Sequence, residues 1–230
     1  MKAFLLAAGI GSRLRPLTNV TPKCMLPVGG RPLLGIWLDA FAAAGVDEVL
    51  VNLHHRPEVV QAYLAARTGP PAVRTFSEPE LLGSAGTLAA NRQWVGDDDF
   101  FLACNADNLT DFRLETLIGA QRASGADATL GVFHSDDPSA GGVVETDADG
   151  IVTAFTEKPQ QPVSDLVNAG IYAFRPGVLD EIKGEPPMDI GYDLLPRLVG
   201  RARVVPVEGY FRDIGTPEAY RRAQEDWAAS

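Results

Sequence analysis

Glycine and basic residues near the start of this sequence could together bind phosphate groups. Gly9 and Gly11 follow a short apolar run, and Arg13 and Lys23 come soon after them. Two glycines after a strand let backbone N–H groups approach an anion closely, because no side chain blocks the approach. A polyphosphate carries several negative charges, which only a cluster of donors can balance. The segment is typical of a phosphate-binding turn, although an ordinary strand-to-turn junction also uses glycine.

This turn lacks the marks of two common nucleotide-binding motifs. Leu14 occupies the position of the third glycine in the dinucleotide-binding pattern, and the spacing is not that of a Walker A loop. The apolar run at residues 48–53 has Asn52 near its end and is followed by His54 and His55, where a dinucleotide-binding strand ends in an acidic residue. An NAD-dependent oxidoreductase is therefore an alternative that the sequence does not favour. No acidic residue or cysteine accompanies the two histidines at metal-ligand spacing, so we interpret them as strand-end residues.

Asp107 is a candidate metal ligand. It stands in "ACNADN", directly after an apolar run. Carboxylates hold Mg²⁺, which neutralises the charge of phosphates during phosphoryl and nucleotidyl transfer. A single Asp after a strand can equally be a turn residue or a helix cap, so both interpretations stay open at this point.

Two other segments have both a structural and a functional interpretation. The run from Gly83 to Gly86 is what a loop entering a helix looks like. Glu157 and Lys158 in "FTEKP" form a charged pair of the kind that usually lies on a solvated surface. Neither segment points to one function without further information.

Composition limits the class of protein. With 230 residues, 46% hydrophobic and 22% charged, the chain can form one substantial core, and it shows no sign of disorder. A net charge of −10 argues against a nucleic-acid-binding surface but allows a small anion in a locally basic pocket. Cys24 and Cys104 lie far apart with no metal-ligand spacing, which argues against a disulfide framework or a zinc site. No apolar run is long enough to span a bilayer, so we expect a cytoplasmic protein with no membrane partner.

The first half of the chain alternates between strand-like and helix-like segments. Short, continuously apolar runs indicate strands of a covered sheet, and apolar residues at helical spacing indicate helices between them. We expect strands at 3–8, 48–53, 72–77 and 100–107, and helices at 32–45, at 57–67 and after Gly86.

The second half begins with a hairpin signal. Asp149 and Gly150 lie between two strand-like runs in residues 141–159, which indicates antiparallel strands. After the hairpin we expect strands at 168–174 and 202–209, and helices at 189–200 and 216–229.

Repeated strand–helix–strand order predicts an α/β fold with a mainly parallel sheet, to which the hairpin adds antiparallel strands. Ligands of such sheets bind beyond the carboxyl ends of the strands. The glycine turn and Asp107 both follow expected strands and so fall at those ends.

The segment "LAAGIGSRLRPLTNVTPKCMLPVGGRPLL" closely resembles the opening of the sugar 1-phosphate nucleotidyltransferases, also called sugar-nucleotide pyrophosphorylases. That family's pattern is roughly G-x-G-[ST]-R-[LM]-x-P-L-T followed by P-K-x-[ML]-x-P-[VI]. "LLGSAG", "FTEKP", "NAGIY" and "DIGTPE" also match family segments, so the resemblance covers essentially the whole chain. It implies a three-layer α/β/α sandwich with a Rossmann-like, mixed and mainly parallel sheet.

The resemblance implies that a nucleoside monophosphate is transferred from an NTP to a sugar 1-phosphate, which yields an NDP-sugar and pyrophosphate. The heptose and mannose 1-phosphate guanylyltransferases look closest, which suggests GTP with a heptose or hexose 1-phosphate. Uridylyl transfer, or nucleotidyl transfer to another phosphorylated substrate such as choline phosphate, remains an alternative. A catalytically silent nucleotide-sensing subunit is another, although every charged position that the family needs is filled.

The family resemblance assigns most of the glycine turn to the nucleotide. Arg13 and Lys23 would stabilise the reacting phosphates, and with Asp107 they are the expected catalytic residues. Cys24 stands where the family usually has Pro, and we interpret it as a small apolar side chain with no catalytic part. The expected nucleotide-binding residues are Ala8, Gly9, Gly11, Ser12, Arg13, Lys23, Glu78, Leu82, Gly83 and Gly86. Of these, the resemblance implies that Leu82, Gly83 and Gly86 bring the backbone close to the nucleobase and the ribose.

The resemblance also implies a Mg²⁺ site and a sugar site. Asp107 and Asp213, the latter in "DIGTPE", would hold Mg²⁺. Lys158 would bind the sugar phosphate and Glu157 a pair of hydroxyls. The full set expected to bind the sugar substrate is Asn105, Gly142, Glu157, Lys158, Asn168 and Gly170.

We expect residues 1–230 to form a single domain as a monomer or homodimer. Its nucleotide-binding half would be about residues 1–112, and its sugar-phosphate-binding half about 113–230. Longer relatives append a C-terminal β-helix, which we do not expect here because the sequence ends soon after "DIGTPE".

Overall fold

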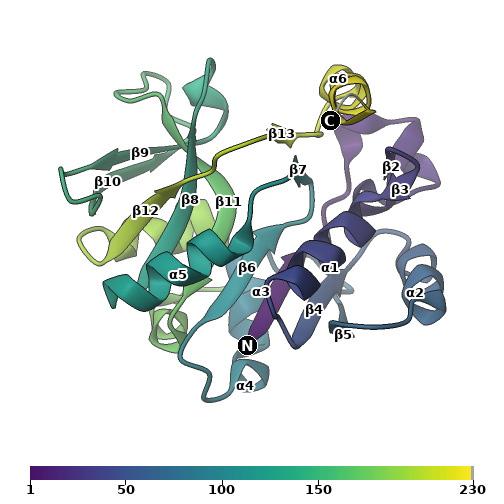
Figure 1. Cartoon of the computed structure of the whole chain (residues 1–230), viewed down its shortest axis with the longest axis horizontal. Coiled ribbons are helices and arrows are strands. Elements are labelled where there is room, and N and C mark those ends of the chain that lie inside the picture. Colours follow the sequence, from purple (N-terminus) through teal and green to yellow (C-terminus); the bar gives the residue numbers. More distant parts are fainter. Residues whose placement is uncertain (229–230) are drawn as a thin grey trace. The chain divides into compact units, whose positions relative to one another are not determined.

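The computed structural model describes residues 1–228, and in it the chain divides into two compact units (Figure 1). The first unit holds Met1–Leu81, Cys104–Phe112 and the chain from Gly209 onward. The second holds Leu82–Ala103 and Arg113–Glu208. These units differ from the expected halves, 1–112 and 113–230, because the C-terminal segment packs in the first unit and residues 82–103 pack in the second.

Parallel strands form the sheet of the first unit. They are β1 (Lys2–Leu6), β4 (Glu48–Leu53) and β5 (Ala72–Ser77). Phe4 is paired with Leu50 in the register of β1 and β4. The strands β1 and β4 are apolar and almost wholly buried along their length, as expected for parallel strands covered on both faces. These elements agree closely with the expected ones.

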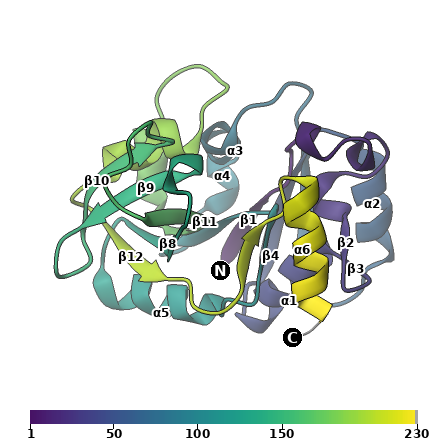
Figure 2. The same cartoon turned by 90° about the horizontal axis from the view of Figure 1, so that it is seen from above.

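Helices α1 (Leu33–Ala43), α2 (Pro57–Ala66) and α6 (Pro217–Ala228) complete the larger elements of the first unit. Leu34 and Leu38 of α1 are fully buried, which is why the apolar residues of this helix recur at helical spacing. Helix α6 contacts β2 and β13 of the same unit (Figure 2). The last residue of the helix expected at 216–229 lies outside the described residues.

Several short elements complete the first unit. Strand β6 (Phe101–Asn105) continues into β7 (Asn108–Thr110), which pairs antiparallel with β13 (Phe211–Asp213). This pairing sets Asp213 opposite Asn108, beside Asp107. The remaining short elements of this unit are β2 (Pro27–Val28), β3 (Arg31–Pro32) and helical turns at Ser12–Leu14, Leu17–Asn19 and Lys23–Met25.

The second unit is built mainly from antiparallel strands. Strands β9 and β10 form the hairpin expected around Asp149 and Gly150, and β11 pairs antiparallel with β8 and β9. Only β12 is parallel to its described partner, β8. The strands are β8 (Ala128–His134), β9 (Gly142–Thr146), β10 (Val152–Glu157), β11 (Leu166–Phe174) and β12 (Ala202–Pro206).

Helices of the second unit depart from the expectations in two places. Helix α5 and strand β8 were not among the expected elements. The helix expected at 189–200 is instead a π-helical turn (Ile190–Leu194) followed by a 3₁₀ turn (Leu195–Leu198), because Pro196 has no N–H to continue an α-helix. The unit's other helices are α3 (Ser84–Ala90), α4 (Arg92–Val95), α5 (Leu114–Ser124) and 3₁₀ turns at Pro138–Ala140 and Pro176–Glu181.

The α/β class is therefore confirmed, with a mixed sheet in which β1, β4 and β5 are parallel in the first unit and β12 is parallel to β8 in the second. No helix within residues 1–228 has the length and apolar character needed to cross a membrane.

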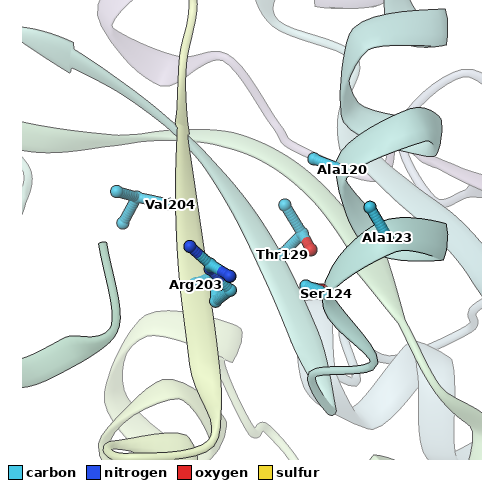
Figure 3. Close-up of a pocket in the computed structure, with 6 residues that line it drawn as sticks. All are labelled: Ala120, Ala123, Ser124, Thr129, Arg203 and Val204. Atoms are coloured by element: carbon cyan, nitrogen blue, oxygen red, sulfur yellow. The ribbon is translucent and has the colours of Figure 1, made fainter. Parts of the chain in front are cut away.

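A buried polar contact fastens α5 to β8. The hydroxyl of Thr129 donates to Oε1 of Gln121 at 2.6 Å, and Nε2 of Gln121 donates to the carbonyl of Ala126 at 2.8 Å. Thr129 is fully buried and Gln121 is nearly so. Figure 3 shows Thr129 beside α5 in a pocket of about 240 Å³. The residues that line it are Ala120, Ala123, Ser124, Thr129, Arg203 and Val204, and none of them is an expected site residue.

Replacing Thr129 with Val should destabilise the protein, because it removes the hydroxyl that donates to the buried Gln121. We expect the free energy of unfolding in urea to fall by about 1–3 kcal/mol. The exposed Thr116 of α5 provides the matched control, and Thr116→Val should change stability little. Equal stability of the two variants would contradict the assigned contact.

Candidate functional site

The glycine turn presents a row of backbone amides. Within residues 1–228, the amides of residues 9–13 donate no hydrogen bond to the protein. Gly11 has φ +65°, which only glycine adopts without strain, and its carbonyl accepts the hydroxyl of the buried Thr18 at 2.7 Å. Consecutive unpaired amides on a turn held in this way form a concave binding site for an anion.

Ala8, Ser12 and Arg13 belong to the same turn. Ala8 is buried, whereas Ser12 and Arg13 are exposed. A Cβ atom placed on Gly215 would lie 2.8 Å from Nη2 of Arg13 and 2.9 Å from Oδ1 of Asp213. The absence of a side chain at Gly215 therefore leaves room for the guanidinium beside that carboxylate.

Lys23 joins the two aspartates that sequence analysis selected. Its Nζ lies 2.8 Å from Oδ2 of Asp107 and 3.1 Å from Oδ1 of Asp213. The amide of Ile214 also donates to the carbonyl of Asp107 at 3.1 Å, which holds the two segments together. The Lys23 side chain is only 9% exposed, so its positive charge has to be compensated by these carboxylates. The side chains of Asp107 and Asp213 are 42% and 53% exposed.

A small pocket of about 40 Å³ lies beside this cluster, and Gly9, Lys23, Cys24 and Asp107 are part of its lining. Burial raises the pKa of the Cys24 thiol to about 12, with a smaller contribution from the nearby Asp107 charge. The thiol is therefore protonated at neutral pH. It provides no thiolate for catalysis or metal binding, which agrees with the interpretation of Cys24 as an apolar side chain.

The donor set at Asp107 and Asp213 fits Mg²⁺. Within residues 1–228 there is no group of three or more His, Cys, Asp or Glu side chains that could hold a metal ion by itself. Mg²⁺ is commonly held by one or two carboxylates together with substrate phosphates and water. The two exposed carboxylates already converge on one cation, the Lys23 ammonium, and together the three groups carry one net negative charge. The pair suits a cation that takes its other ligands from a phosphate.

Glu78 has a different environment from the rest of the predicted nucleotide site. It is 3% exposed, and its Oε1 accepts from Nδ2 of Asn52 at 2.9 Å. Oδ1 of Asn52 in turn accepts the amide of Ala7 at 2.6 Å. Glu78 is thus linked through Asn52 to Ala7, directly after β1. Its contact with the nucleotide stays a prediction.

The remaining expected residue of the first unit is Asn105, at the end of β6, where it is half-buried. The two histidines after β4 are strand-end residues as expected. His54 contacts the carbonyl of Glu78 at 2.8 Å and His55 the carbonyl of Thr18 at 2.7 Å.

Leu82, Gly83 and Gly86 lie in the second unit, where they pack on Met188. The amides of Ala85 and Gly86 donate to the Met188 carbonyl at 3.0 and 3.2 Å, and the Met188 amide donates to the Leu82 carbonyl at 2.8 Å. Gly83 has φ +76°, and a Cβ atom there would lie 2.1 Å from the Met188 carbonyl oxygen. Glycine is required at this position by both conformation and space.

Apart from Asn105, the predicted sugar residues lie on strands β9, β10 and β11 or directly after β10. Glu157 is opposite Gly142 in the register of the hairpin, and a Cβ atom on Gly142 would lie 2.6 Å from Oε2 of Glu157. The Glu157 side chain is 13% exposed. Burial raises the pKa of the Glu157 carboxyl, as does the nearby Asp189, while Lys158 lowers it.

Lys158 and Asn168 complete this group. Lys158 has φ +47°, an uncommon conformation for a residue other than glycine, and its side chain is 56% exposed. Such strain is frequent at functional sites. Nδ2 of Asn168 donates to the hydroxyl of Tyr172 at 2.6 Å, across the irregularity in β11 that contains Gly170 at φ +69°.

Sequence reasoning missed the residues that support the site. Thr18 holds the glycine turn, Asn52 links Glu78 to Ala7, and Gly215 leaves space for Arg13. Gly191 was also missed, although it borders Glu157 closely enough to exclude a side chain. The glycine in "DIGYD" and the one in "DIGTP" were visible signals of such close approach.

Comparisons with known proteins found related sequences and structures. The family model described as "Nucleotidyl transferase" matches residues 2–230. The mannose-1-phosphate guanyltransferases of Schizosaccharomyces pombe and Candida albicans are each 35% identical to this chain over 227 residues, which cover 96% of it. The chain spans 62% of the length of these two relatives. HddC from Yersinia pseudotuberculosis has the same fold, with a TM-score of 0.81 at 23% identity over 98% of this chain and 99% of its own.

Replacing Gly11 with Ala should damage both stability and anion binding. The variant places a side chain in the left-handed region, which costs about 1–2 kcal/mol of stability. The new Cβ atom would also lie 2.9 Å from Cγ2 of Thr18. Gly45 is a matched control, because it has φ +73° and nothing within 4 Å of its Cβ position. We expect Gly45→Ala to lose only the conformational part of the stability. In calorimetric titrations with inorganic tripolyphosphate, only Gly11→Ala should bind more weakly than the unmodified protein. An equal loss of tripolyphosphate affinity in the two variants would contradict the role of this turn in binding an anion.

Glu157→Gln should stabilise the protein at neutral pH. A raised pKa means that the folded state disfavours the charged carboxylate, so stability falls as pH rises from the unfolded pKa to the folded one. The gain in Tm should therefore be present at pH 7 and shrink as pH falls through this window. The exposed Glu145 on β9 provides a control, and Glu145→Gln should give no such pH-dependent gain. A pH-independent Tm difference for Glu157→Gln would contradict the assignment.

Proposed function

Because this chain belongs to the nucleotidyl transferase family, we propose that it transfers a nucleoside monophosphate from an NTP to a sugar 1-phosphate. We propose GTP as the donor and a hexose or heptose 1-phosphate as the acceptor. Mannose 1-phosphate is the first candidate, since the names of two relatives that are 35% identical state this activity.

The observation that carries the proposal is the contact of Lys23 with both Asp107 and Asp213. A buried ammonium and two half-exposed carboxylates at the carboxyl end of a parallel sheet provide what polyphosphate chemistry requires. The ammonium can donate to phosphate oxygens, and the carboxylates can bind Mg²⁺. The amides of residues 9–13 add donors in the same unit.

The reaction is an in-line displacement at the α-phosphorus. An oxygen of the sugar 1-phosphate forms a bond to the α-phosphorus, the bond from that phosphorus to the bridging oxygen breaks, and pyrophosphate leaves. The attacking oxygen is already ionised at neutral pH, so the step needs neither a general base nor a covalent intermediate. Arg13 and Lys23 stabilise the charge that develops on the phosphate oxygens, and positioning supplies much of the remaining acceleration.

Asp107 and Asp213 are the residues that would hold Mg²⁺. The ion supplies neutralisation of charge on the non-bridging oxygens of the phosphates. Lys23, which balances both carboxylates, would then be available to donate to phosphate.

We assign the sugar substrate mainly to residues of the second unit, with Asn105 of the first unit as a further predicted contact. Lys158 provides an exposed ammonium for the sugar phosphate, and Glu157 provides a carboxylate that can accept from two hydroxyls. Asn105, Gly142, Asn168 and Gly170 are proposed to complete the contacts with the substrate.

Pyrophosphate release with Mg²⁺ tests the proposal. The four NTPs and dTTP are each assayed against a panel of sugar 1-phosphates that includes mannose, glucose and heptose 1-phosphates. We expect GTP with one sugar phosphate to be productive and Asp107→Asn to lower kcat by at least about 10²-fold.

Asp39 offers a matched control for this substitution. It is an exposed aspartate of the first unit that pairs with Arg31 and Arg67, away from the proposed ligands. Asp39→Asn should retain full activity. Absence of product with every pair, or full activity of Asp107→Asn, would overturn the proposal.

A further inference from the structure

Residues 188–191 of the second unit contact two proposed binding segments at once. On one side they pair with residues 82–86, the segment proposed to contact the nucleobase. On the other side they touch Glu157, since a Cβ atom on Gly191 would lie 2.3 Å from Oε2 of Glu157. Residues 188–191 are therefore placed where they can couple binding of the nucleotide to binding of the sugar 1-phosphate.

Ser84 and Asp189 form the side-chain part of this connection. The hydroxyl of Ser84 donates to Oδ2 of Asp189 at 2.8 Å and accepts the amide of Ile190 at 2.7 Å. Oδ1 of Asp189 accepts the amides of Gly191 and Tyr192 at 2.8 and 3.4 Å. Both oxygens of one carboxylate are thus used, one by the base segment and one by the turn that borders Glu157.

The two carboxylates on either side of Gly191 also act on each other. The Cβ position of Gly191 lies 2.3 Å from Oε2 of Glu157 and 3.2 Å from Oδ1 of Asp189. A small rotation of Asp189 therefore changes the space and the charge that Glu157 experiences. The hydrogen bond from Ser84 holds one oxygen of that carboxylate and the amides of Gly191 and Tyr192 hold the other, so all three set its rotation.

We propose that Ser84 and Asp189 are positioning residues that couple the nucleobase segment to the sugar-binding carboxylate Glu157. The inference rests on the proposed function and goes beyond it, because neither side chain has to touch a substrate. Binding of the nucleotide to residues 82–86 orders residues 188–191, which in turn fixes Glu157 for the sugar. The two substrates then bind more tightly together than separately.

Hydrogen–deuterium exchange and binding titrations test this coupling. The probes are a non-hydrolysable GTP analogue with a methylene between the α- and β-phosphorus, and mannose 1-phosphate. With the analogue alone, exchange of the amides at 190–192 should slow. The analogue should also tighten mannose 1-phosphate binding about fivefold or more.

Ser84→Ala should remove both effects at concentrations that saturate the variant with the analogue. Ser84→Thr keeps a hydroxyl and should retain both effects. Ser124→Ala is the control, since the Ser124 hydroxyl also donates one hydrogen bond, to the carbonyl of Gln121, and accepts one, from the amide of Ala126. Asp189→Asn provides a second test in case Ser84→Ala does not fold, which circular dichroism reveals.

The outcomes separate this inference from the proposed function. If the unmodified protein forms product but shows no coupling, or if Ser84→Ala keeps it, the inference is overturned and the proposed function stands. If the unmodified protein forms no product with any pair and the analogue leaves exchange at 190–192 unchanged, both are overturned. Loss of coupling in Ser84→Ala with its retention in Ser84→Thr and Ser124→Ala supports the inference.

Discussion

A buried ammonium ion needs nearby negative charge, and Lys23 meets this need with two aspartates from distant parts of the sequence. Residue 23 follows the glycine turn, Asp107 follows β6, and Asp213 ends β13. The pairing of β7 with β13 and the hydrogen bond from the Ile214 amide to the Asp107 carbonyl hold the two aspartate segments together beside Lys23. Because the carboxylates stay half-exposed while the lysine is covered, the cluster is held together and still open to a cation or a phosphate.

Each unit positions part of the proposed site. In the first unit, strand β1 leads into a turn whose amides at 9–13 have no partner within residues 1–228, and Thr18 and Asn52 bind the backbone of that turn and of Ala7 before it. In the second unit, glycines at 83, 142 and 191 allow backbone and carboxylate groups to approach more closely than any other residue would permit. Glycine therefore occurs at these positions in strands and turns, because the Cβ atom of another residue would lie too close to the neighbouring groups.

Sequence reasoning selected the glycine turn, Lys23, Asp107 and the "FTEKP" segment as candidates, because local patterns and a family resemblance mark them. Their association follows from long-range packing, which no local pattern contains. The return of the chain from Gly209 into the first unit was missed for that reason, and so was the division at residues 82–103. Pro196 was visible in the helix expected at 189–200, but the π-helical turn before it depends on Asp189 accepting the amides of Gly191 and Tyr192. Helix α5 went unpredicted although its apolar positions Leu114, Leu117 and Ile118 have helical spacing.

The central claim is that Asp107 and Asp213 together hold a divalent cation, with Lys23 balancing them in its absence. A crystal structure with Mn²⁺ and the non-hydrolysable GTP analogue tests this claim most directly, because anomalous scattering locates the metal without reference to activity. The account predicts one Mn²⁺ coordinated by both aspartates, with Nζ of Lys23 moved from the carboxylates to the phosphates. A metal bound elsewhere, with Lys23 still paired to Asp107 and Asp213 while the nucleotide is bound, would contradict it.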